Sequence, residues 1–125
     1  MNITRVYADS HGESHFADFT LDLADAGQIG RLSAPIPARS VIFRTNDPGY
    51  DYDWHTAPRR QFIVLLDCAI EIETSDGERR TFRAGDVLLV EDTAGRGHRT
   101  RSIEPRERRS IFIELDPPSP SGSAP

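Results

Sequence analysis

The amino-acid sequence predicts an all-β fold, and three observations support this prediction. Apolar residues recur mostly with a period of two or in short dense runs, as expected for strands. Gly, Pro, Asp and Asn separate these runs. No long window shows the spacing of an amphipathic helix, and the one short candidate, residues 24–29, is too brief to be stable alone. Roughly eight to ten short strands at this spacing favour a sandwich or a barrel.

The first expected strands precede a sharp break in the chain. They lie at 3–8, at 16–23 and at 40–44, and the last contains the strand-prone run Val41-Ile42-Phe43. The stretch Asn46-Asp47-Pro48-Gly49 then turns the chain.

The remaining strands follow this turn. Residues 60–66 are apolar at both parities, which predicts a strand covered on both faces. Residues 70–73 alternate, so one face of that strand is expected to meet water. Ser75-Asp76-Gly77 predicts a hairpin turn into a strand at 78–83. Three more strands are expected at 87–90, 98–103 and 109–115.

The length of 125 residues indicates one domain, expected over residues 1–116. Residues 117–125 contain only Pro, Ser, Gly and Ala, and we expect a disordered tail there. No apolar run approaches the roughly twenty residues of a membrane span, and no signal peptide is evident. The single cysteine, Cys68, cannot form an intrachain disulfide. We therefore expect a cytoplasmic protein that does not bind membranes.

Charge narrows the range of functions. All fifteen cationic side chains are arginines, and the absence of lysine excludes Schiff-base chemistry. The net charge of −5 argues against nucleic-acid binding. Arginines concentrate between residues 96 and 109, and we expect them to form a salt-bridged outer face opposite Glu71 and Glu73. Alternatively, this Arg-rich face binds an acidic partner.

A polar face leads into the central apolar strand. In an extended chain, alternate residues from 51 to 61 project to one side, and these are Asp51, Asp53, His55, Ala57, Arg59 and Gln61. The same face continues as Ile63 and Leu65. This pattern predicts the mouth of a barrel, with hydrocarbon below and a ligand cavity above. His98 begins a later strand and is expected to face His55 across that cavity.

Two segments of the chain resemble the conserved motifs of the cupins. The run from Trp54-His55 to Cys68 resembles the first motif. Gly85-Asp86, the apolar residues 87–90 and Gly95-Arg96-Gly97-His98 resemble the second. The resemblance covers roughly half the chain and implies a jelly-roll barrel, also called a double-stranded β-helix, of the small RmlC-like type. It also implies a homodimer.

In that family the two motifs supply the ligands of a divalent metal ion. His55 matches the first histidine, and His98 matches the histidine of the second motif. Ala57 replaces the second histidine, Gln61 replaces the glutamate, and Cys68 stands at the motif glycine. Because two imidazoles hold a divalent ion weakly, further ligands are needed. The hypothetical transition-metal site comprises His55, His98, Gln61 and Asp53.

The sequence supports three functions. The leading interpretation is a small cupin that binds a small polar or anionic molecule in its barrel through His55, Arg59, Gln61 and His98. The first alternative is a metal-dependent enzyme of the oxygenase or isomerase type, with Glu91 and Asp53 as catalytic candidates for proton transfer. The second is a non-catalytic protein that binds a partner through the Arg-rich face. Whether the protein is an enzyme stays open.

Other residues receive structural interpretations. The carboxylates of Glu91 and Asp92 follow the strand at 87–90. They either accept a proton from His98 or form a solvated turn. Tyr50, Tyr52 and Trp54 lie at the opposite parity to His55 and are expected to pack rather than to stack on a ligand. His15 lies in a short polar segment that we expect to be an exposed loop and not a metal site.

Overall fold

The structure is a computed structural model that describes residues 1–117. The predicted tail at 117–125 lies outside the described residues except for Pro117. The extent of the single domain, residues 1–116, stays a prediction. None of the helical structure in the described part of the chain has the length and apolarity of a membrane-spanning helix.

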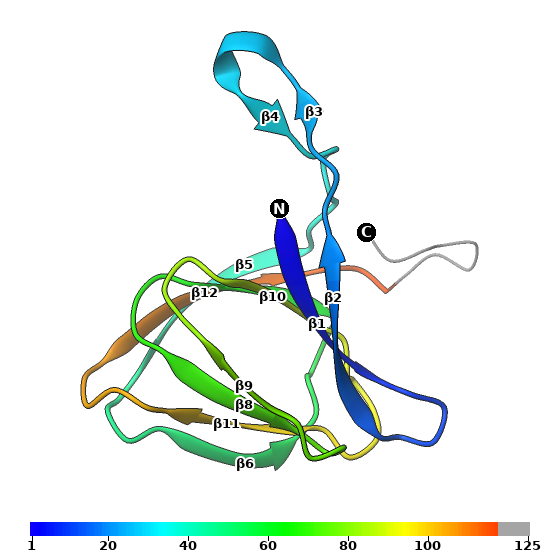
Figure 1. Cartoon of the computed structure of the whole chain (residues 1–125). Coiled ribbons are helices and arrows are strands. Elements are labelled where there is room, and N and C mark those ends of the chain that lie inside the picture. The colour runs from blue at the N-terminus through cyan, green and yellow to red at the C-terminus, as the bar shows by residue number, and fades with distance from the viewer. Residues whose placement is uncertain (118–125) are drawn as a thin grey trace.

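Two sheets face each other in a barrel (Figure 1). The six-stranded sheet has the order β2-β1-β10-β7-β12-β5 and consists of β1 (Asn2–Ala8), β2 (Ser14–Thr20), β5 (Ser40–Asn46), β7 (Gln61–Leu65), β10 (Val87–Val90) and β12 (Arg108–Glu114). The four-stranded sheet has the order β6-β11-β8-β9 and consists of β6 (Asp51–His55), β8 (Ile70–Thr74), β9 (Arg79–Phe82) and β11 (His98–Ser102).

The strands from β5 to β12 pair in a nested order. The first of them pairs with the last, β6 with β11, β7 with β10, and β8 with β9, each antiparallel. The segment from β5 to β12 is therefore one long hairpin. It is wound so that successive strand pairs alternate between the two sheets. This arrangement is a jelly roll. The predicted all-β, double-stranded β-helix fold is confirmed.

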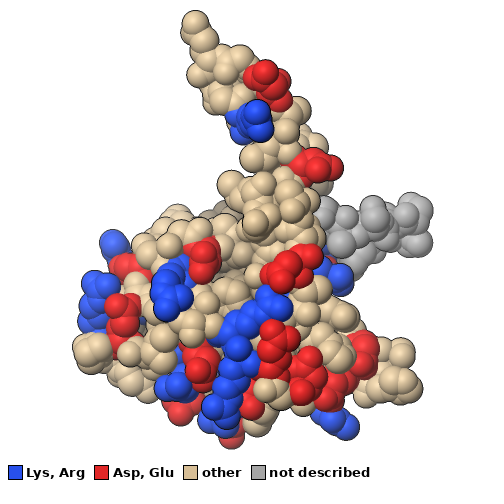
Figure 2. Space-filling model, viewed as in Figure 1, with Lys and Arg blue, Asp and Glu red and all other residues tan. Residues whose placement is uncertain are grey.

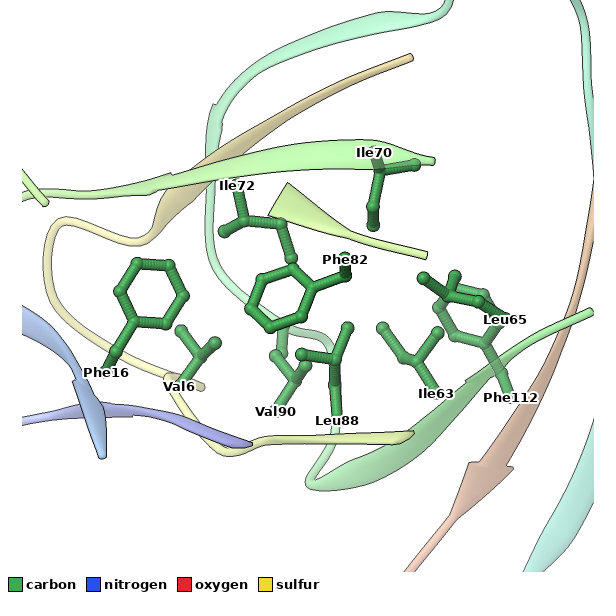
Figure 3. Close-up of a cluster of buried hydrophobic side chains, with 11 residues drawn as sticks. Val6, Phe16, Ile63, Leu65, Ile70, Ile72, Phe82, Leu88, Val90 and Phe112 are labelled. Carbon is green, nitrogen blue, oxygen red and sulfur yellow. The ribbon is translucent and has the colours of Figure 1, made fainter. Parts of the chain in front are cut away.

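Hydrocarbon fills much of the space between the sheets. Inward side chains from both sheets meet in the core, as Figure 3 shows, and they include Val6, Ile63, Leu65, Ile72, Phe82, Leu88 and Val90. One long side of the barrel is closed by contacts between β2 and the β8–β9 hairpin. There the rings of Phe16 and Phe82 lie 5.9 Å apart, and Arg80 binds Asp18. The unpaired edges on the opposite side are β5 and β6.

A second apolar cluster covers the outer face of the six-stranded sheet. Phe62 packs there with Ile3, Leu89 and Leu115. Partly buried side chains, among them Leu21 and Ile36, pack against this cluster. The expectation that the strand at 60–66 is buried on both faces holds for this part of β7. Its continuation, Leu66, is exposed.

The segment between β2 and β5 forms an arm that projects from the barrel (Figure 1). It contains two-residue strands, β3 (Ala24–Asp25) and β4 (Arg31–Leu32), joined by a 3-10 turn at Gly27–Ile29. The weak helix candidate at 24–29 is therefore a hairpin tip, and the pattern of the sequence did not predict its strands.

The outer face of the four-stranded sheet is covered by ion pairs. Arg101 lies 2.9 Å from Glu71, and Arg79 lies 3.5 Å from Glu73. The register places the arginines of β11 directly opposite the glutamates of β8. Figure 2 shows acidic and basic side chains interspersed over the barrel surface. The predicted salt-bridged outer face is confirmed for Arg99 and Arg101, whereas Arg108, from the same stretch, is buried.

Candidate functional site

The two histidines singled out by the sequence lie side by side. His55 ends β6 and His98 begins β11, and the antiparallel register pairs these two residues directly. Their ring centroids are 4.5 Å apart with the planes tilted by 56°. The structure therefore brings together two imidazoles that are remote in the sequence.

A β-bulge in β6 decides which side chains face the barrel interior. His98 pairs with His55, but Thr100 pairs with Tyr52, so two steps along β11 correspond to three along β6. The extra residue reverses the alternation, as bulges do, and places Tyr52 and His55 on the same face. Their rings stack with centroids 3.8 Å apart. The parity argument, which put Tyr52 on the opposite face, is wrong at this point.

These rings line a cavity of about 260 Å³ inside the barrel. Its polar lining comes from Arg44, Tyr50, Tyr52, His55, Gln61, His98, Thr100 and Arg108. Its apolar lining includes Ile63, Ile70, Ile72, Val90 and Phe112. The predicted combination of a polar cavity above a hydrocarbon core is present.

Each imidazole is held through Nδ1. His98 Nδ1 lies 2.6 Å from Asp92 Oδ2, and this carboxylate is fully buried. His55 Nδ1 lies 2.7 Å from the backbone oxygen of Asp53. Because a carbonyl oxygen only accepts hydrogen bonds, Nδ1 of His55 must carry the proton. Burial lowers the pKa of His55, which favours the neutral ring with Nε2 as a free acceptor.

Two arginines that the sequence analysis did not select also line the cavity. The Arg108 side chain donates to Asn46 at 2.9 Å, and its Cζ lies 5.4 Å from the Tyr50 ring centre. Arg44 lies over the Phe112 ring at 3.9 Å. The sequence alone does not identify Arg108, because this requires the strand register. β12 and β5 pair Arg108 with Asn46, and only the folded barrel shows which face of this pair is internal.

Three sequence-selected candidates lie outside this cavity. Asp53 is exposed and turned outward by the bulge, and its carboxylate accepts from the Trp54 amide. Arg59 follows the end of β6, where Pro58 breaks the extended chain, so the alternation does not reach it; its side chain lies 3.7 Å from Glu114. Glu91 faces outward and binds Arg5 and Arg60. Its neighbour Asp92 is the carboxylate that reaches His98.

Two further positions match the motif pattern. Gly97 has a φ of +74°, and a Cβ there would collide with the backbone oxygen of His55. This glycine therefore lets the two histidine strands approach. Cys68, at the motif glycine, has a left-handed φ of 55°. Together with the nested jelly roll, these positions agree with the motif pattern.

The chain has an RmlC-like cupin fold.

Solved structures of the following proteins are similar to this chain. NMB1881 from Neisseria meningitidis is 25% identical over 65% of this chain and 79% of its own, with a TM-score of 0.47. The capsular polysaccharide assembling protein CapF from Staphylococcus aureus is 13% identical over 82% of this chain and 30% of its own, with a TM-score of 0.45. An RmlC-like cupin from Desulfovibrio desulfuricans is 12% identical over 90% and 81%, with a TM-score of 0.44. No protein-family model and no curated protein matches the sequence.

The donor set does not fit the metal centre that the cupin motifs imply. His55 and His98 supply two imidazoles and Gln61 a neutral amide, but Ala57 has no donor atom and Asp53 is outside the cavity. Within residues 1–117, no three His, Cys, Asp or Glu side chains are arranged to hold a metal ion. Divalent transition metals are usually held by at least three such ligands. Two imidazoles and one amide fall short of this number.

Proposed function

We propose that this cupin binds a small anionic molecule, of the carboxylate class, inside its barrel. The cavity volume of about 260 Å³ is below the lower end of the range for drug-sized ligands, roughly 300 Å³. The ligand is therefore a small metabolite rather than a nucleotide or a polymer end.

The observation that carries this proposal is the environment of Arg108. Arg108 is only 4% exposed, and its Nε has no hydrogen-bond partner among the described residues. It forms no ion pair with any carboxylate of residues 1–117, and burial lowers its pKa. Because a buried unpaired charge is costly, an anion in the cavity would stabilise this guanidinium. Arg44 adds a second positive charge at the same cavity.

The histidine pair gives the cavity a second polar contact. With Nδ1 engaged on both rings, Nε2 of His55 and of His98 remains to accept a hydrogen bond from a ligand hydroxyl. Asp92 holds the His98 ring in one orientation, as a general base requires. The arrangement supports binding of a hydroxy acid, and whether the protein is an enzyme stays open.

The two alternative functions have less support. A metal-dependent enzyme requires ligands that Ala57 and Gln61 do not supply. A partner that binds the Arg-rich face requires free positive charge, but Arg99 and Arg101 are already paired with Asp51 and Glu71.

A thermal-shift screen with acetate, glycolate, succinate and benzoate tests the proposal. We expect at least one acid to raise the Tm above its value at equal ionic strength in chloride. The shift should fall by more than half in Arg44→Gln and in His98→Gln, and stay unchanged in Arg99→Gln on the outer face. Equal shifts in all three variants, or none with any acid, would contradict the proposal. A Tm rise with Mn²⁺ or Fe²⁺ would instead favour the metal-dependent enzyme.

We also propose that two copies of the chain form a homodimer. Edge strand β5 exposes Phe43, which is 76% exposed, and Val41 beside it. The projecting arm exposes Ile29 at 73%, and an isolated two-stranded hairpin is marginally stable in water. Since both features occur on every copy, a two-fold pair could cover the β5 face of each copy with the partner's arm. Sedimentation should give a mass twice the 14.0 kDa of one chain. The fraction of dimer should be smaller in Phe43→Ser. A monomer at every concentration would contradict this proposal.

A further inference from the structure

A second polar cleft, of about 450 Å³, lies outside the barrel. It is lined by β1, by the loop before β7 and by the residues after β10, and the charged side chains are Arg5, Arg59, Arg60 and Glu91. Side chains alternate at the end of β10, where Val90 lines the internal cavity and Glu91 lines this cleft. The two sites are therefore on opposite faces of the same sheet.

Glu91 holds two guanidinium groups in fixed positions. Arg5 Nε donates to Oε1 and Arg60 Nε donates to Oε2, each at 2.6 Å. The side chains of Arg60 and Glu91 are both only 11% exposed, so these ion pairs are poorly screened by water. The backbone around them is also fixed, since the amide of Glu91 donates to Val6 and that of Leu115 donates to Arg60.

The contacts with Glu91 use only the Nε atom of each guanidinium. Both arginines use Nε, and their terminal amino groups have no hydrogen-bond partner within residues 1–117. Arg59 adds a third guanidinium. Its side chain is 45% exposed and makes one long ion pair, of 3.7 Å, with Glu114. Tyr7 and Thr93, which both carry hydroxyl groups, also line the cleft. All these groups can donate hydrogen bonds to one anion.

The charge of the lining selects the class of ligand. Three arginines line the cleft with Glu91, and Glu114 lies 3.7 Å from Arg59, so positive charge exceeds negative charge by one. A phosphate monoester carries close to two negative charges at neutral pH and accepts hydrogen bonds from several directions. We propose that this outer cleft is a binding site for a phosphate-bearing small molecule, with Arg5, Arg59 and Arg60 as the phosphate contacts and Glu91 as the residue that positions two of them.

The proposal is independent of the internal carboxylate site, and calorimetric titration with inorganic phosphate and with O-phosphoserine tests it. Chloride at equal ionic strength is the comparison anion, because acetate is a candidate ligand of the internal cavity. We expect saturable phosphate binding by the full chain, weakened at least tenfold in Arg59→Gln. This side chain is exposed and makes one long ion pair, so the variant should keep the wild-type Tm. Arg5→Gln should weaken binding in the same direction.

Two matched variants separate this cleft from other sources of binding. Arg106→Gln removes an arginine that is more exposed than Arg59, 64% against 45%, and has a similar ion pair of 3.6 Å. Phosphate affinity should not change in this variant. Arg44→Gln alters the internal cavity, and phosphate affinity should again not change. Loss of phosphate binding in Arg44→Gln but not in Arg59→Gln would overturn the proposal, because it would place the phosphate inside the barrel. Equal weakening in Arg106→Gln, or no heat above that of chloride, would also overturn it.

Discussion

The imidazole of His98 and the carboxylate of Asp92 form a buried pair joined by a hydrogen bond of 2.6 Å from Nδ1 to Oδ2. Both residues are almost completely excluded from water. A charge-assisted bond in this setting fixes the tautomer of the ring and leaves Nε2 for the cavity. The bond joins the loop after β10 to the first residue of β11, so it serves the fold as well as the site.

Asp92→Asn should lower the free energy of unfolding by about 2 kcal/mol, because a hydrogen bond to a charged group is weakened within the interior. Urea denaturation measures this change. The control is Asp53→Asn, which alters an exposed carboxylate two residues before His55 and should change stability little. Equal losses in the two variants would show that the His98–Asp92 bond has no special role in stability.

Gly97→Ala should destabilise the protein more than Gly77→Ala. Both glycines have a positive φ, so each substitution costs about 1 kcal/mol in backbone strain. At Gly77 nothing lies near the added Cβ, whereas at Gly97 it meets the backbone of His55. We expect Gly97→Ala to lose roughly a further 2 kcal/mol from this overlap. Similar Tm values for the two variants would mean that the two histidine strands do not approach as described.

The double variant Ala57→His with Gln61→Glu should create a metal site. These changes restore the two ligand types that the cupin motif has at these positions, beside His55 and His98. We expect Ni²⁺ and Mn²⁺ to raise the Tm of this variant and to leave the wild type unchanged. If the Tm of both proteins rises equally with these metals, the wild-type donor set is sufficient to hold a metal ion.

His15 should make stability depend on pH. Its Nε2 lies 2.7 Å from Asp9 and its Nδ1 lies 3.0 Å from Asp76, which joins β2 to the β8–β9 hairpin. The hydrogen bond to Asp9 is the largest cause of the raised pKa of His15. Stabilisation from a raised histidine pKa is fully present below about pH 6.5, its unfolded value, and is lost as the pH rises through the folded value.

Thermal denaturation of the wild type and His15→Gln across neutral and alkaline pH measures this effect. The Tm difference between the two proteins should be largest below pH 6.5 and should decrease as the pH rises. His11→Gln is the control, since His11 lies in the turn before β2 and its imidazole makes neither of these carboxylate contacts. A Tm difference that grows with pH would contradict the assignment.

Much of the fold could be predicted from local patterns. The alternation at 70–73 and the turn at Ser75-Asp76-Gly77 predict β8 and its hairpin, and the structure has both. The arm was not predicted, because its two-residue strands are too short to produce a periodic pattern.

The candidate site was predictable only in part. His55, Gln61 and His98 do line one cavity, whereas Asp53 does not, because strand parity fails at the bulge in β6. A bulge leaves no clear mark in the sequence. Arg108 was missed for a different reason: among many arginines, only strand register distinguishes the one that faces inward.

An NMR titration of the ¹⁵N-labelled full chain with succinate and benzoate tests the central claim most directly. That claim is that Arg108, His55 and His98 line an internal anion site. We expect saturable shifts of the backbone and side-chain signals of Arg108, Gln61, His98 and Thr100, with little change at the outer residues Arg5 and Arg59. Shifts confined to outer arginines, or no saturable shift with either acid, would contradict the claim.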